Sequence, residues 1–254
     1  CYFPTQIYKP LPEVPVEGQS SVVFDKLGYA ILRGEDGGGE TFMLMDYGPH
    51  GGVHGHPDKL NLILFADGDE LAGEPVMYRY EDARHGQWTK STIAHWALSV
   101  DEHSQNPTEG RLTCFTDQGD VKVMRGQAGE AYPGVALDRT VVQLPGYIVD
   151  IYRAWGPAKH TFDYPLCFRG ALDKVTAVDM SKDPFKPMAE LTPGYMHLKA
   201  IGPHDASSGW TGQWSRAAQP AENGNRDTPA SHVAATVLPA GRTSVWVGQV
   251  PGER

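Results

Sequence analysis

The sequence predicts an all-β protein, an antiparallel β-sandwich of about a dozen strands. Short runs rich in β-branched and aromatic residues recur along its 254 residues, and 29 glycines and 20 prolines interrupt them. No long segment shows the apolar period of an amphipathic helix. Short strands separated by frequent turn residues are typical of antiparallel sheets that pack face to face.

The predicted strands begin after a proline-rich segment that ends at Pro15. Turn residues separate nine successive runs, which are Ser21–Phe24, Tyr29–Arg33, Thr41–Met45, Leu60–Ala66, Ala97–Val100, Arg111–Phe115, Val121–Arg125, Thr140–Leu144 and Tyr147–Trp155. The stretch Ala217–Arg226 is rich in Ala, Pro, Asn and Gly and is expected to be an exposed loop. Two more strands, His232–Leu238 and Thr243–Val247, are expected after it. No internal repeat is evident, so we expect one domain.

One predicted strand, Leu60–Ala66, is apolar on both sides. Leu60, Leu62 and Leu64 share one face, and Ile63 adds apolar area to the other. We therefore expect this strand to lie centrally with both faces largely buried. It would provide a rigid base for the polar segment that precedes it.

The composition excludes some classes of function. Hydrophobic residues make up 40% of the chain, and no apolar segment approaches the roughly 20 residues needed to span a bilayer. A net charge of −9 without clustered Lys and Arg argues against a nucleic-acid partner. An anionic substrate would need a local basic pocket, which Lys59, Arg79, Arg84 and Lys90 are close enough in sequence to supply.

The cysteines and the first residue give little information on function. Because the chain begins with Cys1 and not with methionine, upstream sequence is expected; its first residues contain no apolar signal core. Cys1, Cys114 and Cys167 lie far apart and lack the paired spacing of a zinc ribbon or a redox motif. One disulfide with a free thiol and three reduced thiols both fit this count, so the redox compartment stays open.

Histidines gather in one glycine-rich segment, Asp46–Lys59, which has His50, His54 and His56 within seven positions. Glycines let the backbone turn sharply and approach a ligand closely. Because alternate residues of an extended chain point to one face, His54 and His56 can share a site. Asp58 follows and can orient a neighbouring ligand. The segment therefore predicts a site of chemistry.

The same segment predicts a zinc site. Zinc prefers tetrahedral nitrogen, sulfur and carboxylate ligands, so two histidines and a carboxylate from neighbouring strands would suit it. His56 is the first predicted ligand. Glu74 and His95 each stand beside a predicted strand that can pair with the first, and they complete the predicted set.

Three stretches carry a family resemblance: HGGVHGHPDKLNL, IAHWALSVD and YIVDIYRAWGPAKHTFDYPL. Together they resemble the carboxy-terminal region of heparinase II/III-like polysaccharide lyases, including oligoalginate lyases. The resemblance is strongest from Asp46 to Gln105, continues from Tyr147 to Gly170, and is weaker around Gly194–Arg216. It implies a β-sandwich domain that normally packs on an α/α-toroid domain, with the substrate cleft between them.

The resemblance has consequences for the organisation of the chain. Residues 1–18 are expected to be a lead-in from an N-terminal α/α-toroid domain that is missing here, and residues 19–254 to form the sandwich. Helices that supply part of the active site would lie on missing sequence or on another chain. We therefore expect this chain alone to have little lyase activity.

The resemblance also implies a reaction and a set of residues. Such lyases cleave uronic-acid polysaccharides by β-elimination, in which a base removes the C5 proton and an acid protonates the leaving oxygen. His54 matches the sandwich-borne active-site histidine. His56, Glu74 and His95 match the ligands of a mainly structural zinc, although the family usually has aspartate at the middle position, which leaves another acid open as the ligand.

Further residues are candidates for contact with substrate. Tyr80 lies near the place of a cleft tyrosine in similar lyases, although a packed aromatic is an equal alternative. Arg79 and Trp88 are further candidates. His50 either lines the cleft or caps the glycine turn. Trp96 stands where similar lyases commonly have asparagine.

Three functions remain open at this point. The leading one is a lyase part acting on an anionic uronate glycan such as alginate or a heparin-like polymer. A noncatalytic carbohydrate-binding sandwich with a structural metal site is the main alternative, and metal-dependent hydrolysis is the third. Periplasmic or secreted location is expected from the family, because such substrates lie outside the cytosol.

Overall fold

The protein is all-β, as predicted. A computed structural model describes residues 20–36, 39–66, 68–218 and 230–251, and in this part of the chain it contains seventeen strands and four single-turn helices. About a dozen strands were expected, and four of the seventeen (β1, β6, β11 and β13) have only two or three residues. The lead-in 1–18 and residues 219–226 of the predicted loop lie outside the described residues.

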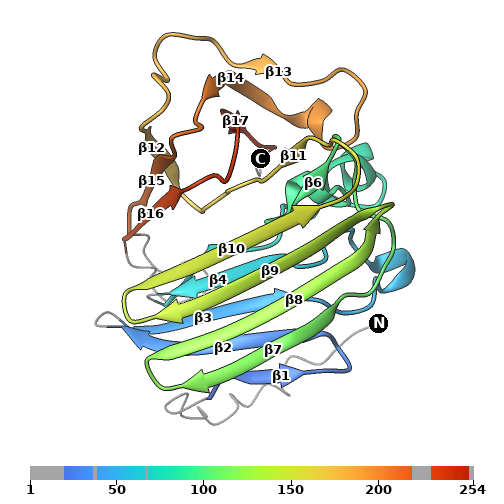
Figure 1. Ribbon diagram of the computed structural model, residues 1–254. Helices are drawn as coiled ribbons and strands as arrows, with labels where there is room; N and C mark the ends of the chain where they lie inside the picture. Colours follow the sequence, from blue (N-terminus) through green and yellow to red (C-terminus); the bar gives the residue numbers. More distant parts are fainter. Residues whose placement is uncertain (1–19, 37–38, 67, 219–229, 252–254) are drawn as a thin grey trace, which may run out of the picture.

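Two antiparallel sheets form the main sandwich (Figure 1). The first sheet has the order β1-β2-β3-β4-β5, with strands Val22–Phe24, Tyr29–Asp36, Gly39–Asp46, Leu62–Ala66 and Asp69–Ala72. The second sheet has the order β10-β9-β8-β7, with β7 at Arg111–Gln118, β8 at Val121–Tyr132, β9 at Val135–Leu144 and β10 at Tyr147–Trp155. Each strand follows its neighbour in the chain, and short hairpins build both sheets except between β3 and β4, where a longer loop intervenes.

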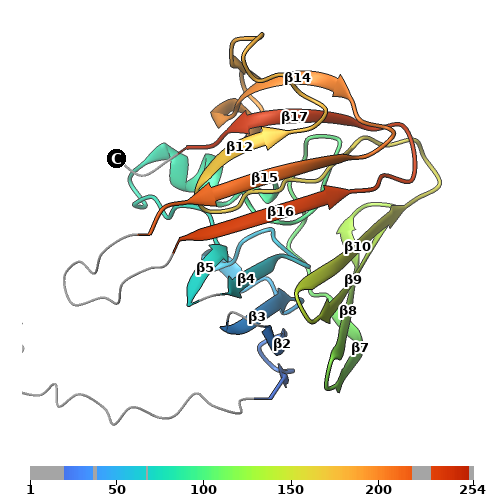
Figure 2. The same cartoon turned by 90° about the vertical axis from the view of Figure 1, so that its left-hand side faces the viewer.

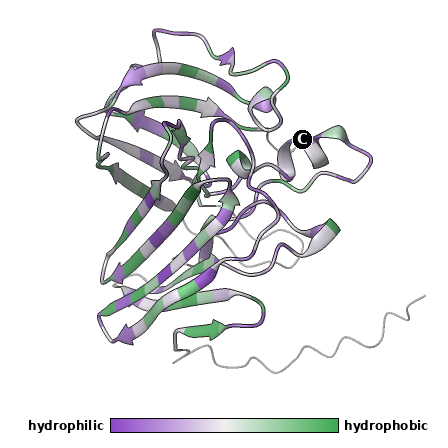
Figure 3. Cartoon of the chain, turned by 45° about the vertical axis from the view of Figure 1, so that its right-hand side comes forward, coloured by the Kyte–Doolittle hydropathy of each residue, from purple (hydrophilic) through white to green (hydrophobic). Residues whose placement is uncertain are grey.

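The core lies between these two sheets. The strands alternate hydrophobic and hydrophilic residues, visible as bands along the long strands in Figure 3, so that every second side chain turns inward. Fully buried residues of the first sheet meet those of the second: Ala30, Leu32, Met43, Met45, Leu62 and Leu64 from one side, and Met124, Leu137 and Val141 from the other.

The C-terminal part adds a smaller pair of sheets above the main sandwich (Figure 2). One contains β12 (Ala171–Val175), β15 (Trp210–Arg216) and β16 (Ser231–Val237), and the other contains β13 (Lys186–Pro187), β14 (Lys199–Asp205) and β17 (Ser244–Gln249). Val175, Ile201, Val245 and Val247 lie in their shared core. Trp214 of β15 belongs to the main core, which joins the two units. A short pair, β6 (Ser99–Val100) with β11 (Phe162–Asp163), lies between them.

The predicted central strand begins later than expected, as β4 from Leu62 to Ala66. Leu60 has a φ angle of 67°, which interrupts the extended backbone before the strand. β4 lies between β3 and β5, and its inner face is buried as predicted. On its outer face Ile63 is half-buried and Phe65 is 38% exposed, so the second face is covered less than predicted.

The sequence did not predict β5, β11, β12, β13, β14 and β15. Their residues give a weak strand signal: Gly202–Pro203 interrupts β14, and β12 carries Asp173 and Lys174 in a five-residue run. None of the helices in the described residues is long and apolar enough to cross a membrane.

A polar cluster on the outer face of the second sheet gives a test of the fold. Asp138 of β9 has a fully buried side chain and accepts hydrogen bonds from Arg125 Nη2 and Gln127 Nε2, both at 2.7 Å, and from Arg153 Nη2 at 2.7 Å. Burial alone would raise the pKa of this carboxyl, but these donors outweigh it and lower the pKa to about 2.

We expect Asp138 to contribute stability that disappears in acid. Its folded pKa lies below the ordinary value of about 3.9, so the contribution is complete above about pH 4 and is lost as the pH falls through about 2. Asp138→Asn should therefore lower the free energy of unfolding at pH 7, with a difference from wild type that shrinks toward pH 2. Chemical denaturation at several pH values measures it. Asp173→Asn, an exposed aspartate of β12, is the control, and a pH-independent difference for Asp138→Asn would contradict the prediction.

Candidate metal centre and active site

The loop between β3 and β4 depends on glycine for its shape. Gly51 and Gly52 have φ angles of 79° and 64°, and the single 3₁₀ turn Gly52–His54 follows from them. A Cβ atom at Gly55 would lie 1.3 Å from the carbonyl oxygen of His50. No other residue fits at position 55, so the glycine-rich sequence specifies how the histidines are presented.

Three predicted ligands meet at one point. His56 Nδ1 lies 3.1 Å from His95 Nε2 and 3.5 Å from Glu74 Oε2, and His95 Nε2 lies 3.2 Å from Glu74 Oε2. Ligand atoms about 2.0–2.1 Å from a tetrahedral zinc are separated by about 3.3 Å. The three atoms are therefore spaced as a tetrahedral ion requires.

Neighbouring groups orient these ligands. His95 has a fully buried side chain, and its Nδ1 donates to the Ser91 carbonyl oxygen at 2.9 Å, which leaves Nε2 to face the cluster. Asn61 Nδ2 donates to Glu74 Oε1 at 2.7 Å, and Asn61 Oδ1 accepts from the Trp96 backbone N–H at 3.0 Å. Outer hydrogen bonds of this kind fix ligand orientation in metal sites.

The ionised carboxylate of the cluster would also attract a cation. Burial opposes ionisation of Glu74, but hydrogen bonds from His56 and His95 outweigh it and hold the pKa of this carboxyl well below its usual range. Burial likewise disfavours protonated His95, and the nearby Glu74 carboxylate still raises the pKa of that imidazole. The cluster therefore keeps an ionised carboxylate next to two imidazoles, a donor set that fits zinc.

Asp58 is a fourth potential ligand. His56, Asp58, Glu74 and His95 each offer one ligand atom, and these atoms all lie within 4.8 Å of one another. From the sequence, Asp58 was expected only to orient a neighbouring ligand. The structure instead brings its carboxylate into the same group, while Lys59 Nζ lies 3.2 Å from Asp58 Oδ1.

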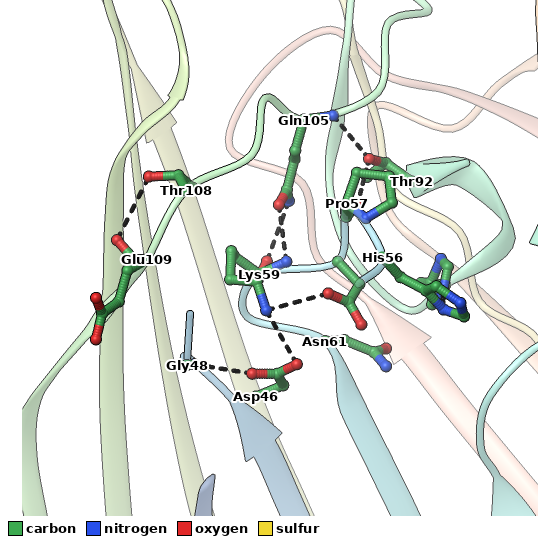
Figure 4. A network of polar contacts seen from close by, with 12 residues as sticks. Asp46, Gly48, His56, Pro57, Lys59, Asn61, Thr92, Gln105, Thr108 and Glu109 are labelled. Carbon is green, nitrogen blue, oxygen red and sulfur yellow. Dashed lines mark hydrogen bonds and ion pairs between the residues drawn. The ribbon is translucent and has the colours of Figure 1, made fainter. Parts of the chain in front are cut away.

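Lys59 anchors the ligand loop from inside the protein (Figure 4). Its side chain is only 3% exposed, and Nζ lies 3.0 Å from Asp46 Oδ2. Its backbone N–H donates to Gln105 Oε1 at 2.7 Å, and Gln105 Nε2 donates to the Lys59 carbonyl oxygen at 3.1 Å. Thr92 completes the network, because its hydroxyl donates to the Pro57 carbonyl oxygen at 2.5 Å and accepts from the Gln105 N–H at 2.8 Å.

The predicted catalytic histidine stands at the surface beside this cluster. His54 is exposed, and its Nδ1 lies 3.0 Å from the hydroxyl of Tyr80, whose side chain is 68% exposed. The Tyr80 ring in turn packs against His85 with centroids 4.4 Å apart. Two groups able to exchange protons therefore face solvent side by side.

Other predicted substrate contacts differ in their placement. His50 is half-buried, and its carbonyl lies against Gly55. Arg79 is exposed next to Tyr80, as a substrate contact would require. Trp88 is only 3% exposed, because the π-helical turn His85–Thr89 turns its indole into a small cluster with Tyr195 and Leu198. This burial argues against the predicted contact of Trp88 with substrate.

Two of the four cations of the expected basic pocket pair with carboxylates of this chain. Lys59 is buried between Asp46 and Asp58, and Arg84 pairs with Asp82 at 2.5 Å. Lys90 donates to the Val53 carbonyl oxygen, which fixes its ammonium group near His54.

The fold and this cluster define a β-sandwich domain with a candidate metal centre. Comparison of the sequence with known families then identifies it further. Residues 17–152, more than half of the chain, match the model of the heparinase II/III-like C-terminal domain, and the chain belongs to this family.

Individual relatives agree with the family. An alginate lyase of Stenotrophomonas maltophilia (strain K279a) is 29% identical over 199 residues, which cover 68% of this chain and 26% of that protein. An exo-oligoalginate lyase of Saccharophagus degradans (strain 2-40 / ATCC 43961 / DSM 17024) is 29% identical over 170 residues, which cover 57% of this chain and 23% of that protein. The chain therefore spans about a quarter of the length of these curated relatives.

Solved structures share the fold. The crystal structure of the heparan sulfate lyase HepC from Pedobacter heparinus has a TM-score of 0.56 and 17% identity, covering 93% of this chain and 37% of that one. A heparinase III structure has a TM-score of 0.54 and 16% identity, covering 80% of this chain and 30% of that one. The similarity confirms the predicted sandwich, which forms about a third of those larger chains.

We expect the cluster to bind about one divalent ion per chain. Zinc added to the metal-free protein at about 100 times its dissociation constant should stabilise the fold by about 2.7 kcal/mol, because the ion binds only the folded state. Glu74→Gln should abolish most of this gain, since it removes the negative charge. Thermal unfolding with and without zinc measures the effect. Glu70→Gln, which alters a surface pair with Arg169, is the matched control, and an equal loss in both variants would contradict the assignment.

Proposed function

We propose that this chain is the sandwich part of a polysaccharide lyase that cleaves a uronic-acid-containing glycan by β-elimination. The observation that carries the proposal is the exposed contact of His54 with Tyr80 beside the metal cluster. Membership of the heparinase II/III-like family supports it, as do relatives named alginate lyase and exo-oligoalginate lyase. Alginate or a heparin-like glycan is the proposed substrate class.

The proposed chemistry uses a histidine and a tyrosine at hydrogen-bond distance. β-Elimination needs a base for the C5 proton, an acid for the leaving oxygen, and donors that offset the uronate charge. His54 and Tyr80 supply two groups that donate or accept protons, and both are open to a ligand from solvent. Arg79, exposed next to Tyr80, is the proposed partner of the uronate carboxylate.

The proposed metal is zinc in a structural role. Four protein donors in one group leave little room for a bound water, and closed four-ligand sites are typical of structural zinc. Such an ion would fix His56 and, two residues before it, the catalytic His54. Its contribution would be to hold the loop, while the proton transfers belong to the exposed side chains.

The active protein is proposed to be larger than this chain. The chain spans about a third or less of the lyases that it resembles, and we propose that an α/α-toroid region completes the substrate cleft. Periplasmic or secreted location is proposed as well, because uronate polymers lie outside the cytosol. A noncatalytic carbohydrate-binding sandwich is the alternative, and measurements of turnover distinguish it from a lyase.

His54→Ala should reduce turnover by about 10²–10⁴-fold in the protein that includes the proposed helical region, because a proton-transfer group is lost. The fold should be unaffected, since His54 is exposed. The ultraviolet absorbance of unsaturated uronate products measures turnover on alginate and heparin-like polymers. His232→Ala, an exposed histidine of β16, should behave as wild type. Failure of the wild type to form unsaturated sugars from any uronate polymer would overturn the proposal.

Tyr80→Phe tests the second member of the pair. It removes the hydroxyl at 3.0 Å from His54 but keeps the ring packed on His85, so we expect kcat to fall about 10²-fold with little change in thermal stability. Tyr147→Phe on β10, also exposed, is the matched control. Unchanged kcat in Tyr80→Phe would assign this tyrosine a packing role only.

A further inference from the structure

A buried arginine connects the second sheet to the candidate site. Arg139 lies on β9 and its side chain is completely buried. Its Nε and Nη2 donate to the two oxygens of Asp150 at 2.9 and 2.6 Å, and Nη2 also donates to the Tyr164 hydroxyl at 2.9 Å. The remaining nitrogen, Nη1, donates to the carbonyl oxygens of Leu60 at 2.7 Å and Trp96 at 2.5 Å.

These two carbonyls belong to the segments that carry the metal ligands. Leu60 directly follows the loop with His54, His56 and Asp58, and Trp96 directly follows His95. The two segments are 35 or more residues apart in the chain, and they meet at the cluster and at the hydrogen bonds of Thr92 with Pro57 and of Trp96 with Asn61. One guanidinium nitrogen of Arg139 therefore binds both ligand-bearing segments and fixes the spacing between them.

The backbone at Leu60 needs such support. Its φ angle of 67° is unfavourable for a residue with a side chain, so neighbouring bonds must hold it. Its N–H donates to the Asp46 carbonyl oxygen at 2.7 Å, and its carbonyl accepts from Arg139. Hydrogen bonds to both Asp46 and Arg139 therefore hold this conformation.

The chemistry of the pocket requires arginine. Trp96, Tyr152 and Tyr164 surround the guanidinium group with ring centroids 4.8–5.6 Å from its central carbon. A lysine would be sufficient to pair with the Asp150 carboxylate alone. Only a guanidinium group has enough donors to bind Asp150 in a bidentate manner and also reach two carbonyls.

We propose that Arg139 is a positioning residue for the metal centre, which sets the distance between the loop of His56 and that of His95. The inference rests on the proposed metal centre and deepens it. Arg139 touches neither a ligand side chain nor the exposed pair, so its effect passes through the backbone of Leu60 and Trp96.

Cobalt binding tests the proposal. Co²⁺ prefers the same donors as zinc and gives a visible spectrum whose intensity depends on tetrahedral geometry. Arg139→Lys should weaken cobalt affinity by about 10–100-fold, the usual effect of losing an outer partner of metal ligands, and should reduce the intensity of the tetrahedral bands at saturation. Far-ultraviolet circular dichroism confirms that the wild type and each variant are folded before cobalt is added.

Two controls separate positioning from a general loss of stability. Arg125→Lys makes the same substitution at another bidentate carboxylate pair on the same sheet, that with Asp138. Val141→Ala opens the same core two residues farther along β9. Both should lower the melting temperature and leave the cobalt affinity and spectrum as in wild type. Equal changes in these controls and in Arg139→Lys would overturn the proposal.

Tyr164→Phe provides the test if Arg139→Lys does not fold. It removes a hydroxyl that contacts Arg139 and accepts from Trp96 Nε1 at 2.7 Å, and it should weaken cobalt binding by about tenfold. Wild-type affinity in this variant would overturn the proposal. Failure of the wild-type chain to bind cobalt would instead overturn the metal centre itself, so the two failures are distinguishable.

Discussion

Two buried cations on either side of Leu60 constrain the site. Lys59 and Arg139 are almost completely inaccessible, and a buried charge is tolerated only with nearby opposite charges and satisfied hydrogen bonds. Lys59 therefore requires Asp46 and Asp58 at fixed places, and Arg139 requires Asp150. Because these partners belong to both sheets, satisfying the charges fixes the loop that bears the histidines relative to the sandwich.

This fixed loop explains why His54 and His56, only two residues apart, point in different directions. His56 points into the cluster, where Glu74 and His95 supply further potential ligand atoms, whereas His54 lies on the solvent side against Tyr80. The 3₁₀ turn at Gly52–His54 and the absence of space at Gly55 separate the two directions. A rigid inner group thus supports the exposed pair of His54 and Tyr80, as the proposed proton transfer requires.

Features of the protein that follow from local sequence patterns could be predicted from the sequence. Strand alternation predicted the sandwich, and the spacing of His56, Glu74 and His95 with a family resemblance predicted a cluster that the structure brings together. The contacts of Arg139 were not predictable, because nothing in the sequence around it indicates carbonyl partners 79 and 43 residues away. The burial of the Trp88 indole was likewise not predictable, because the π-helical turn His85–Thr89 has no clear sequence signal.

The two departures from similar lyases are connected through Asn61. Glu74 stands where aspartate is usual, and its longer side chain reaches both histidines while Asn61 holds its second oxygen. Asn61 is itself held by the backbone of Trp96, which stands where asparagine is common. The Trp96 indole turns inward, with its ring 5.3 Å from Phe168 and its nitrogen on Tyr164. The indole links the orientation of the candidate ligands to the hydrogen bonds of Arg139, so Trp96 supports the candidate metal centre from inside the protein.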